Sequence, residues 1–161
     1  MKRMFIPLFS ALLLAITAGP AQAQVPKGST SFGAQMSLGE NVDLGLGGRV
    51  GFGLAGVVEK LQGTVTLNIF FPGQNTSYWG LNANALYPLK LESGAVITPY
   101  AGAGLGIARY SNRRTETKLN LNLVAGTLFG SREKLVPFAE IRLPVWGIDN
   151  IGFFLTGGIW F

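Results

Sequence analysis

The last eleven residues of the chain, 151 to 161, read IGFFLTGGIWF. Every second residue from Ile151 to Phe161 is a large apolar residue or glycine, whereas the positions between them combine glycine and threonine with Phe154 and Trp160. A period of two is the repeat of a β-strand, in which successive side chains point to opposite faces. The stretch has no charged residue, so it predicts a strand whose apolar face must be covered.

Seven further stretches alternate in the same way. They span residues 31–38, 42–54, 64–71, 79–87, 96–108, 119–126 and 135–143. The clearest is 42–54, in which large apolar residues from Val42 to Leu54 alternate with Asp43, Arg49 and glycines. Glycine, proline and asparagine separate the stretches, as is typical of turns. The pattern predicts eight antiparallel strands, and because this number is even, both termini should lie at the same end of the sheet.

The composition argues against an ordinary soluble domain. The 161 residues include 23 glycines, no cysteine and no histidine, and only 13% are charged, whereas soluble domains average roughly 25%. After residue 24 the chain has no run of the ~18 or more apolar residues that a membrane helix needs. The net charge of +5 includes Lys2 and Arg3 of the leader, so it does not indicate a nucleic-acid partner.

The first 23 residues have the three parts of a secretory signal peptide. Lys2 and Arg3 precede an apolar run over residues 4–18, and the small residues of Ala21-Gln22-Ala23 follow. A retained membrane anchor is the alternative, but the run is short for spanning a membrane and contains Pro7. We therefore predict a signal peptide over residues 1–23 and a single barrel domain over residues 24–161.

The chemistry of the less apolar face decides between two barrel architectures. A soluble ligand-binding barrel would turn this face to water and should carry many lysines and acids there. The face carries mainly glycine, asparagine, threonine and serine, which suit the narrow interior of an eight-stranded barrel. We therefore predict an all-β fold, an eight-stranded antiparallel up-and-down transmembrane β-barrel with its apolar face toward lipid.

Alternation places three charged residues, Arg49, Glu140 and Arg142, inside this barrel. An arginine on the lipid side near mid-membrane would cost ~2–4 kcal/mol, whereas an inward arginine can pair with an acid. We predict a buried ionic network in which Glu140 pairs with Arg49, Arg142 or both, and in which Asp43 and Lys118 lie nearer the rim. The alternative is that these side chains are separate and solvated by water in the lumen.

The ends of the predicted strands carry aromatic residues and one basic cluster. Aromatic girdles are typical of membrane barrels at both interfaces. The candidates are Phe71, Tyr78, Trp79, Tyr110 and Trp146 at one rim, and Tyr87, Phe129 and Phe161 at the other. The longest predicted loop, residues 109–117, carries Arg109, Arg113 and Arg114, which form either a solvated loop or a site for anionic lipid headgroups.

Candidate chemistry is sparse in this sequence. The sequence has no histidine, which is the usual proton-transfer partner of a serine nucleophile. GAGLG at 102–106 lies inside a predicted strand rather than before a helix, so it is not a phosphate-binding loop. We expect no catalytic site, cofactor or metal. Three roles stay open: a structural or surface-interaction barrel, which we favour, a narrow pore for small solutes, and a soluble periplasmic lipid-binding barrel.

Four segments resemble the small outer-membrane β-barrel domain family of the OmpA and OmpX type. They are PYAGAGLGIA at 99–108, LNLNLVAGTLFG at 119–130, PFAEIRL at 137–143 and the terminal GGIWF. The resemblance covers nearly all of the chain after the leader, and it rests on glycine and alternation patterns rather than on a catalytic motif.

The resemblance implies a location in a Gram-negative-type outer membrane with both termini periplasmic and the turns at 39–41, 72–77, 109–117 and 144–150 outside. It also implies periplasmic chaperones and the barrel-assembly machinery as partners during biogenesis, with Ile159, Trp160 and Phe161 as the insertion signal. The expected surroundings are outer-membrane lipids including lipopolysaccharide, and we expect a monomer.

Overall fold

The structure is a computed structural model that describes residues 30–40, 42–54, 60–71, 76–89, 97–111, 115–130, 135–147 and 152–161. The predicted signal peptide, residues 1–23, lies outside the described residues. Among the residues described, no helix is both long and apolar enough to cross a membrane.

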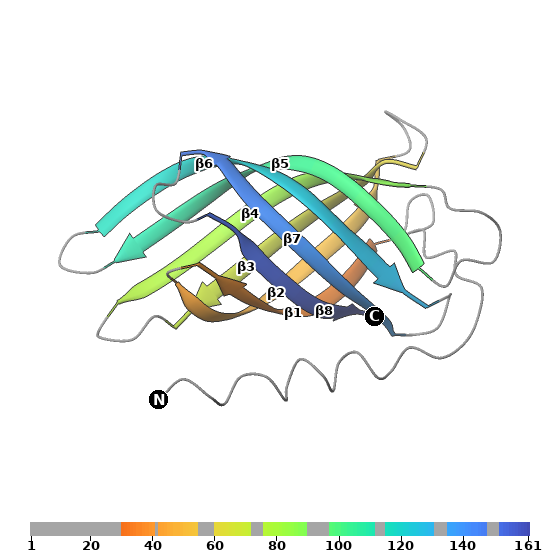
Figure 1. Ribbon diagram of the computed structural model, residues 1–161, viewed down its shortest axis with the longest axis horizontal. Coiled ribbons are helices and arrows are strands. Elements are labelled where there is room, and N and C mark those ends of the chain that lie inside the picture. The colour runs from red at the N-terminus through yellow and green to blue at the C-terminus, as the bar shows by residue number, and fades with distance from the viewer. Residues whose placement is uncertain are drawn as a thin grey trace.

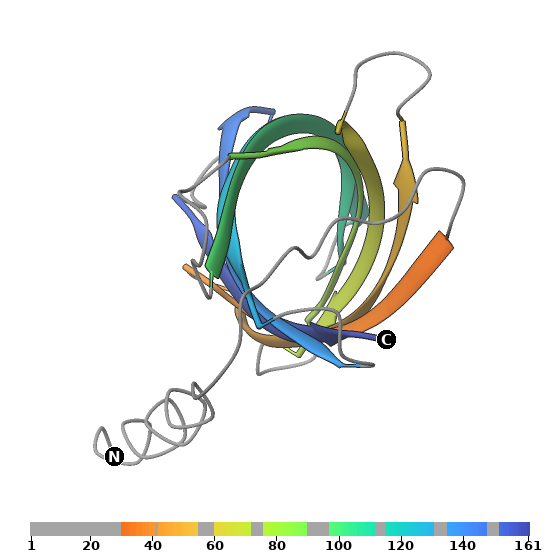
Figure 2. The same ribbon diagram turned by 90° about the vertical axis from the view of Figure 1, so that its right-hand side faces the viewer.

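Eight antiparallel strands form a closed barrel, because each strand pairs with its sequence neighbours and β8 also pairs with β1. The strands are β1 (Thr30–Gly39), β2 (Asp43–Gly53), β3 (Gln62–Phe70), β4 (Ser77–Pro88), β5 (Ile97–Ser111), β6 (Thr115–Phe129), β7 (Val136–Trp146) and β8 (Phe154–Trp160). They run obliquely to the long axis in Figure 1, and Figure 2 looks along that axis into the ring. The predicted eight-stranded up-and-down barrel is confirmed.

The barrel has two distinct ends. The connections β1–β2, β3–β4, β5–β6 and β7–β8 lie at one end, which we call the hairpin end (Figure 1). Thr30 and Phe161 lie at the opposite end, which we call the terminal end. Both limits of the described chain therefore lie on the same side, as the even number of strands predicts.

Large apolar side chains cover the outside of the barrel. Alternation along the strands exposes Leu46, Leu67, Leu105, Leu119 and Leu123, of which Leu105 is 66% exposed. The intervening side chains are buried in the lumen, and most of them are polar. Closing the sheet leaves no open edge along the shared length of the strands, so backbone groups there are paired within the barrel.

The hairpin between β5 and β6 is longer than the sequence suggests. We predicted a loop over residues 109–117, but β5 continues to Ser111 and β6 begins at Thr115. Arg109 and Tyr110 pair with Thr117 and Glu116, so these polar residues extend the ladder rather than form a loop. Strand pairing can continue beyond the apolar band because backbone hydrogen bonds do not depend on side-chain polarity.

The turn between β1 and β2 corrects the prediction about the direction of the Val42 side chain. Val42, expected on the outer face, is only 2% exposed and lies inside the barrel. The backbone N–H of Val42 bonds to the Gly39 carbonyl at 3.3 Å, and Asp43 has a positive φ of 55°. This turn conformation interrupts the alternation, which resumes at Leu44.

The last hairpin also differs from the prediction. We expected a loop from residue 144, but β7 continues to Trp146, and its register with β6 shifts between Leu121 and Asn122, next to Pro144. Proline lacks an N–H donor, so such an irregularity is a usual place for it in a sheet. The final strand is shorter than residues 151–161. The Gly152 N–H donates to the Glu40 carboxylate at 3.1 Å instead of joining a ladder.

Candidate functional site in the barrel lumen

The lumen is filled in three layers. The hairpin-end cluster consists of apolar and aromatic residues, namely Val42, Phe70, Tyr78, Ala108 and Phe154. The terminal-end cluster consists of Leu86, Tyr100, Val124, Leu128 and Phe138, with Val136 and Trp160 packed against it. A middle layer between the two clusters contains buried polar and charged side chains. Among the described residues, the lumen is therefore polar at its centre and apolar toward both ends.

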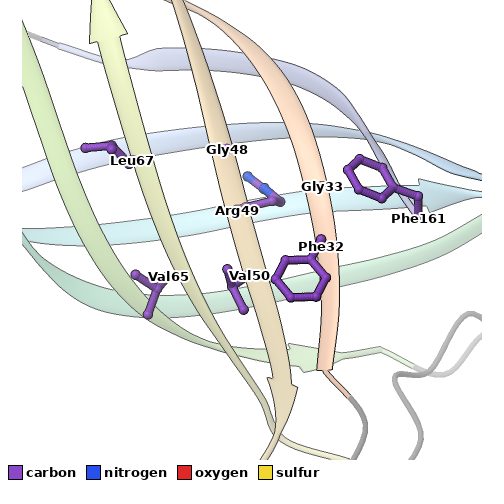
Figure 3. Close-up of a pocket in the computed structure, with 8 residues that line it drawn as sticks. All are labelled: Phe32, Gly33, Gly48, Arg49, Val50, Val65, Leu67 and Phe161. Carbon is purple, nitrogen blue, oxygen red and sulfur yellow. The ribbon is translucent and has the colours of Figure 1, made fainter.

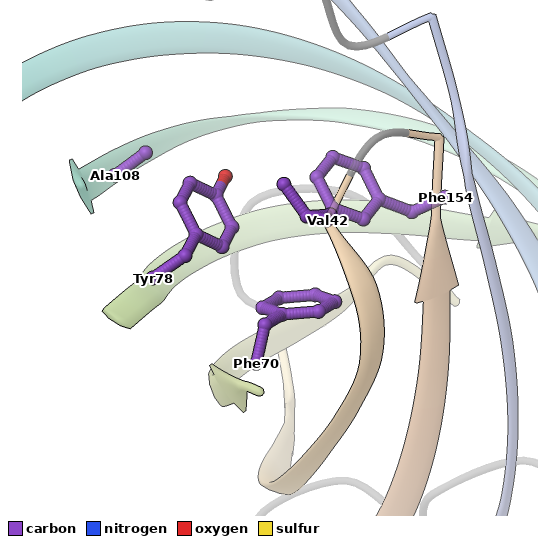
Figure 4. Packing of buried hydrophobic residues seen from close by; sticks show 5 residues of the cluster. All are labelled: Val42, Phe70, Tyr78, Ala108 and Phe154. Atoms are coloured by element: carbon purple, nitrogen blue, oxygen red, sulfur yellow. The ribbon is translucent and has the colours of Figure 1, made fainter. Parts of the chain in front are cut away.

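Aromatic rings fill the hairpin-end cluster, which is drawn in Figure 4. The ring centroid of Phe70 lies 5.1 Å from that of Tyr78 and 5.5 Å from that of Phe154. These tilted arrangements are the ones that aromatic pairs prefer. Tyr78, predicted as a rim residue, is therefore a lumen residue, only 4% exposed, because it shares the inward face of β4 with Asn82.

An ion pair between Arg49 and Glu140 crosses the middle layer. Arg49 Nη1 donates to Glu140 Oε2 and Nη2 donates to Oε1, each at 3.2 Å. Arg49 is 3% exposed and Glu140 8%. The Tyr100 hydroxyl donates to Glu140 Oε2 at 2.9 Å, and Arg49 Nε donates to Gln35 Oε1. The ion pair is therefore bidentate, and the third guanidinium nitrogen, Arg49 Nε, also has a hydrogen-bond partner.

Hydrogen bonds continue from this pair along the wall formed by β3, β2, β1 and β8. Gln35 Nε2 donates to Asn68 Oδ1 at 2.6 Å, and Ser37 Oγ donates to the same oxygen at 3.4 Å. The hydroxyls of Ser37 and Thr156 are 2.8 Å apart. We call the connected set the lumen network. Its members are Tyr100, Glu140, Arg49, Gln35, Asn68, Ser37 and Thr156, from β5, β7, β2, β1, β3 and β8.

Two aromatic faces cover the Arg49 guanidinium. Its Cζ lies 3.9 Å from the ring centroid of Phe138 and 5.3 Å from that of Trp160. A cation over an aromatic face is attracted by the ring quadrupole, and the attraction is larger when water is excluded. Taking the two charges out of water is costly, so leaving one charge without its partner commonly destabilises a protein by ~3–5 kcal/mol.

The other three residues of the predicted network lie nearer the hairpin end than the Arg49–Glu140 pair. Arg142 is buried in the lumen, but its Cζ lies 4.2 Å from the ring centroid of Phe154, at the hairpin-end cluster. Asp43 is exposed at the start of β2, because the turn conformation takes it out of the inward row. Lys118 is half-buried near the hairpin end of β6. Of the five residues predicted for the ionic network, the structure thus brings Arg49 and Glu140 into contact.

Sequence reasoning missed the uncharged members of the lumen network. Gln35, Asn68 and Tyr100 all fall on the inward face by alternation, so their orientation was available from the sequence. Their contacts depend on which strands face one another across the lumen, and strand parity alone does not determine this.

The predicted insertion residues lie at the closure between β8 and β1. Ile159 is 40% exposed on the outer face, and Trp160 packs against the terminal-end cluster. The Phe161 backbone N–H donates to the Phe32 carbonyl at 2.9 Å, and the Phe161 side chain is 63% exposed. Of the predicted basic cluster, Arg109 is exposed on β5, whereas Arg113 and Arg114 lie outside the described residues.

A hollow of about 420 Å³ lies between the outer side chains near the closure. Phe32, Val50, Val65, Leu67 and Phe161 line it, as Figure 3 shows. In the described part of the chain, no group of three or more acidic, histidine or cysteine side chains could hold a metal ion. The lumen network cross-links the wall of the barrel.

Comparison with known proteins identifies the fold. No family model matches the sequence, and no curated protein matches it. The N-terminal β-barrel domain of Pseudomonas aeruginosa OprF is similar in structure, with a TM-score of 0.67 and 15% identity over 84% of this chain and 97% of that one. Neisserial surface protein A has a TM-score of 0.57 and 14% identity over 81% of this chain and 94% of that one. The chain therefore has the fold of the small eight-stranded outer-membrane barrels.

Proposed function

We propose that this chain is a non-enzymatic outer-membrane barrel protein with a structural or surface-interaction role. The observation that carries the proposal is the apolar outer face around a lumen filled by a hydrogen-bonded network and two apolar clusters. An apolar exterior of this extent suits hydrocarbon rather than water. A filled lumen favours a role for the barrel surface over passage of solutes, so we do not favour the narrow pore.

The β5–β6 hairpin is the best candidate for the interacting surface. β7 pairs with β6 only from Trp146, opposite Leu121. In the described residues, Thr115, Glu116 and Thr117 therefore pair with β5 beyond the end of β7, and their side chains are exposed. An exposed strand edge can bind an extended segment of a partner by adding a strand. Neisserial surface protein A, a structural neighbour, is named as a surface protein.

Export and assembly complete the proposal. A signal peptide over residues 1–23 would direct the chain through periplasmic chaperones to the barrel-assembly machinery, which would recognise Ile159, Trp160 and Phe161. Arg109 lies opposite the aromatic Trp79 near the hairpin end, where the phosphates of lipopolysaccharide would be within reach of its guanidinium.

Cysteine labelling of intact cells tests the location and the orientation together. The chain has no cysteine, so single-cysteine variants report one position each. Thr117→Cys at the hairpin end should react with a membrane-impermeant maleimide in intact cells. Thr30→Cys at the terminal end should react only after the outer membrane is permeabilised.

Equal labelling of both positions in intact cells, or recovery of the protein in the soluble periplasmic fraction, would reject the proposal. The second result would support the soluble lipid-binding barrel instead. Conductance steps in planar bilayers from the purified wild-type barrel would support the pore.

A further inference from the structure

The wall formed by β4, β5 and β6 carries four inward asparagines around a strand of glycines. Asn82 and Asn120 lie on either side of Gly106 in the paired strands, and Asn84 and Asn122 lie on either side of Gly104. We call these four asparagines the amide wall. Their exposures are 2% for Asn82, 6% for Asn84, 2% for Asn120 and 1% for Asn122.

The glycines of β5 allow the amides to lean over the strand. A Cβ at Gly106 would overlap the amide oxygens of Asn82 and Asn120, and a Cβ at Gly104 would overlap that of Asn84. The wall thus places amide groups from β4 and β6 against the backbone of β5. Among the described residues, no direct hydrogen bond joins the amide wall to the lumen network, although Gly80, next to Asn82 in the inward row of β4, pairs with Asn68 of that network.

Four polar atoms of the amide wall have no hydrogen-bond partner within the protein. They are Asn82 Nδ2, Asn84 Oδ1, Asn120 Oδ1 and Asn122 Oδ1. The one direct bond within the wall runs from Asn122 Nδ2 to Asn82 Oδ1 at 3.0 Å. Exchanging N and O in both of these amides would reverse this bond and still leave one atom of each without a partner. Asn82 and Asn122 therefore each keep one polar atom without a hydrogen-bond partner in either orientation of the two amides.

Room for a methyl group exists beside one of these atoms, Asn82 Nδ2. Gly80 is buried on the inward face of β4, and a Cβ added there would have Asn82 Nδ2 at 3.8 Å and the Ile107 carbonyl oxygen at 3.9 Å as its nearest neighbours. A buried polar atom without a partner, beside a position with room for a methyl group, suits an internal water molecule, which takes about 2–4 polar partners.

We propose that the amide wall is a binding site for internal water. One water beside Gly80 accepts a hydrogen bond from Asn82 Nδ2 and donates to the free oxygens of neighbouring asparagines. The charges of the lumen favour water over a cation, because the buried charged side chains in the described residues are Arg49, Arg142 and Glu140, two positive and one negative.

The two apolar clusters close this site at both ends. On β4, the inward row runs from Tyr78 of the hairpin-end cluster through Gly80, Asn82 and Asn84 to Leu86 of the terminal-end cluster. The bound water therefore exchanges with bulk water more slowly than surface water does. This inference does not depend on the proposed surface role, since it concerns only the interior.

NMR of the full barrel in detergent micelles, labelled with ¹⁵N-asparagine, tests the proposal. The side-chain NH₂ groups of the amide wall should show cross-peaks to water with the sign that long-lived contacts give. The matched variants are Gly80→Ala and Gly48→Ala, because a Cβ at either position would make only ordinary van der Waals contacts but Gly48 lies on the exposed outer face. Gly80→Ala should abolish the Asn82 cross-peak, and Gly48→Ala should preserve it.

Two results would overturn the inference, and the wild-type spectrum decides between them even if Gly80→Ala does not fold. Absence of water cross-peaks at all four asparagines would show that the amides satisfy one another directly. Saturable shifts of the same NH₂ signals when Na⁺ is exchanged for K⁺ or Cs⁺ at constant ionic strength would show a cation site instead.

Discussion

Replacing Glu140 by alanine should destabilise the folded barrel more than any change of a charged residue at the barrel rim. The variant leaves the Arg49 guanidinium, 3% exposed, without its carboxylate partner, and it removes the acceptor of the Tyr100 hydroxyl at 2.9 Å. Breaking a buried ion pair from one side costs ~3–5 kcal/mol. We therefore expect Glu140→Ala to lower the free energy of unfolding by about this amount.

Urea titration of the barrel folded in lipid vesicles measures this change. Tryptophan fluorescence follows unfolding, and the change in gel mobility between unheated and heated samples gives an independent measure of the folded fraction. The double variant Arg49→Met/Glu140→Leu should be more stable than either single variant, because it leaves no uncompensated charge.

Glu116→Ala is the matched control, since Glu116 is an exposed acid on the β5–β6 hairpin. Its effect should stay within about 0.5 kcal/mol, as for most surface changes. If Glu140→Ala unfolds at the same urea concentration as Glu116→Ala, the pair is not buried in the way the structure shows, and the reasoning fails.

Further predictions concern the hairpin-end cluster and the glycines. Phe154→Ala should lower the free energy of unfolding by ~3–5 kcal/mol in the same titration, because the ring is 1% exposed and its removal leaves a cavity. Arg142→Ala should cost ~2 kcal/mol through loss of the contact with the Phe154 ring, and this cost should disappear when Phe154 is already alanine. Gly48→Ala should be neutral or raise the free energy of unfolding by ~0.4–1 kcal/mol. Gly102→Ala should lower it by ~1–3 kcal/mol, because the new Cβ of residue 102 would overlap the Ala85 carbonyl. Gel mobility and the urea midpoint of unfolding distinguish the two variants.

Alternation in the sequence was sufficient to predict the barrel and the direction of its faces. Along β6, for example, Leu119, Leu121 and Leu123 point outward while Asn120 and Asn122 are buried, as a period of two requires. Alternation failed where the backbone leaves the strand conformation. The positive φ of Asp43 turned Val42 inward, and no residue pattern in that stretch indicates it.

The ionic pair was predictable in part. The cost of charge in lipid and the parity of Arg49 and Glu140 placed both inside, but parity could not choose between Arg49 and Arg142 as the partner of Glu140. That choice depends on position along the barrel axis. Arg142 lies one inward step nearer the hairpin end than Glu140 on β7, where the Phe154 ring is its neighbour. Likewise, the aromatic Tyr78 resembled a rim residue because its strand begins only at Ser77.

The short final strand has a consequence for how the barrel assembles. β8 pairs over seven residues with β1, from Gly33 opposite Trp160 to Gly39 opposite Phe154, whereas β5 and β6 pair over fifteen. The hairpins join residues close in sequence and can form early, but the seam between β1 and β8 must bring together residues more than a hundred positions apart. We therefore expect closure of this seam to be the last step of folding, because it must close the longest loop in the barrel.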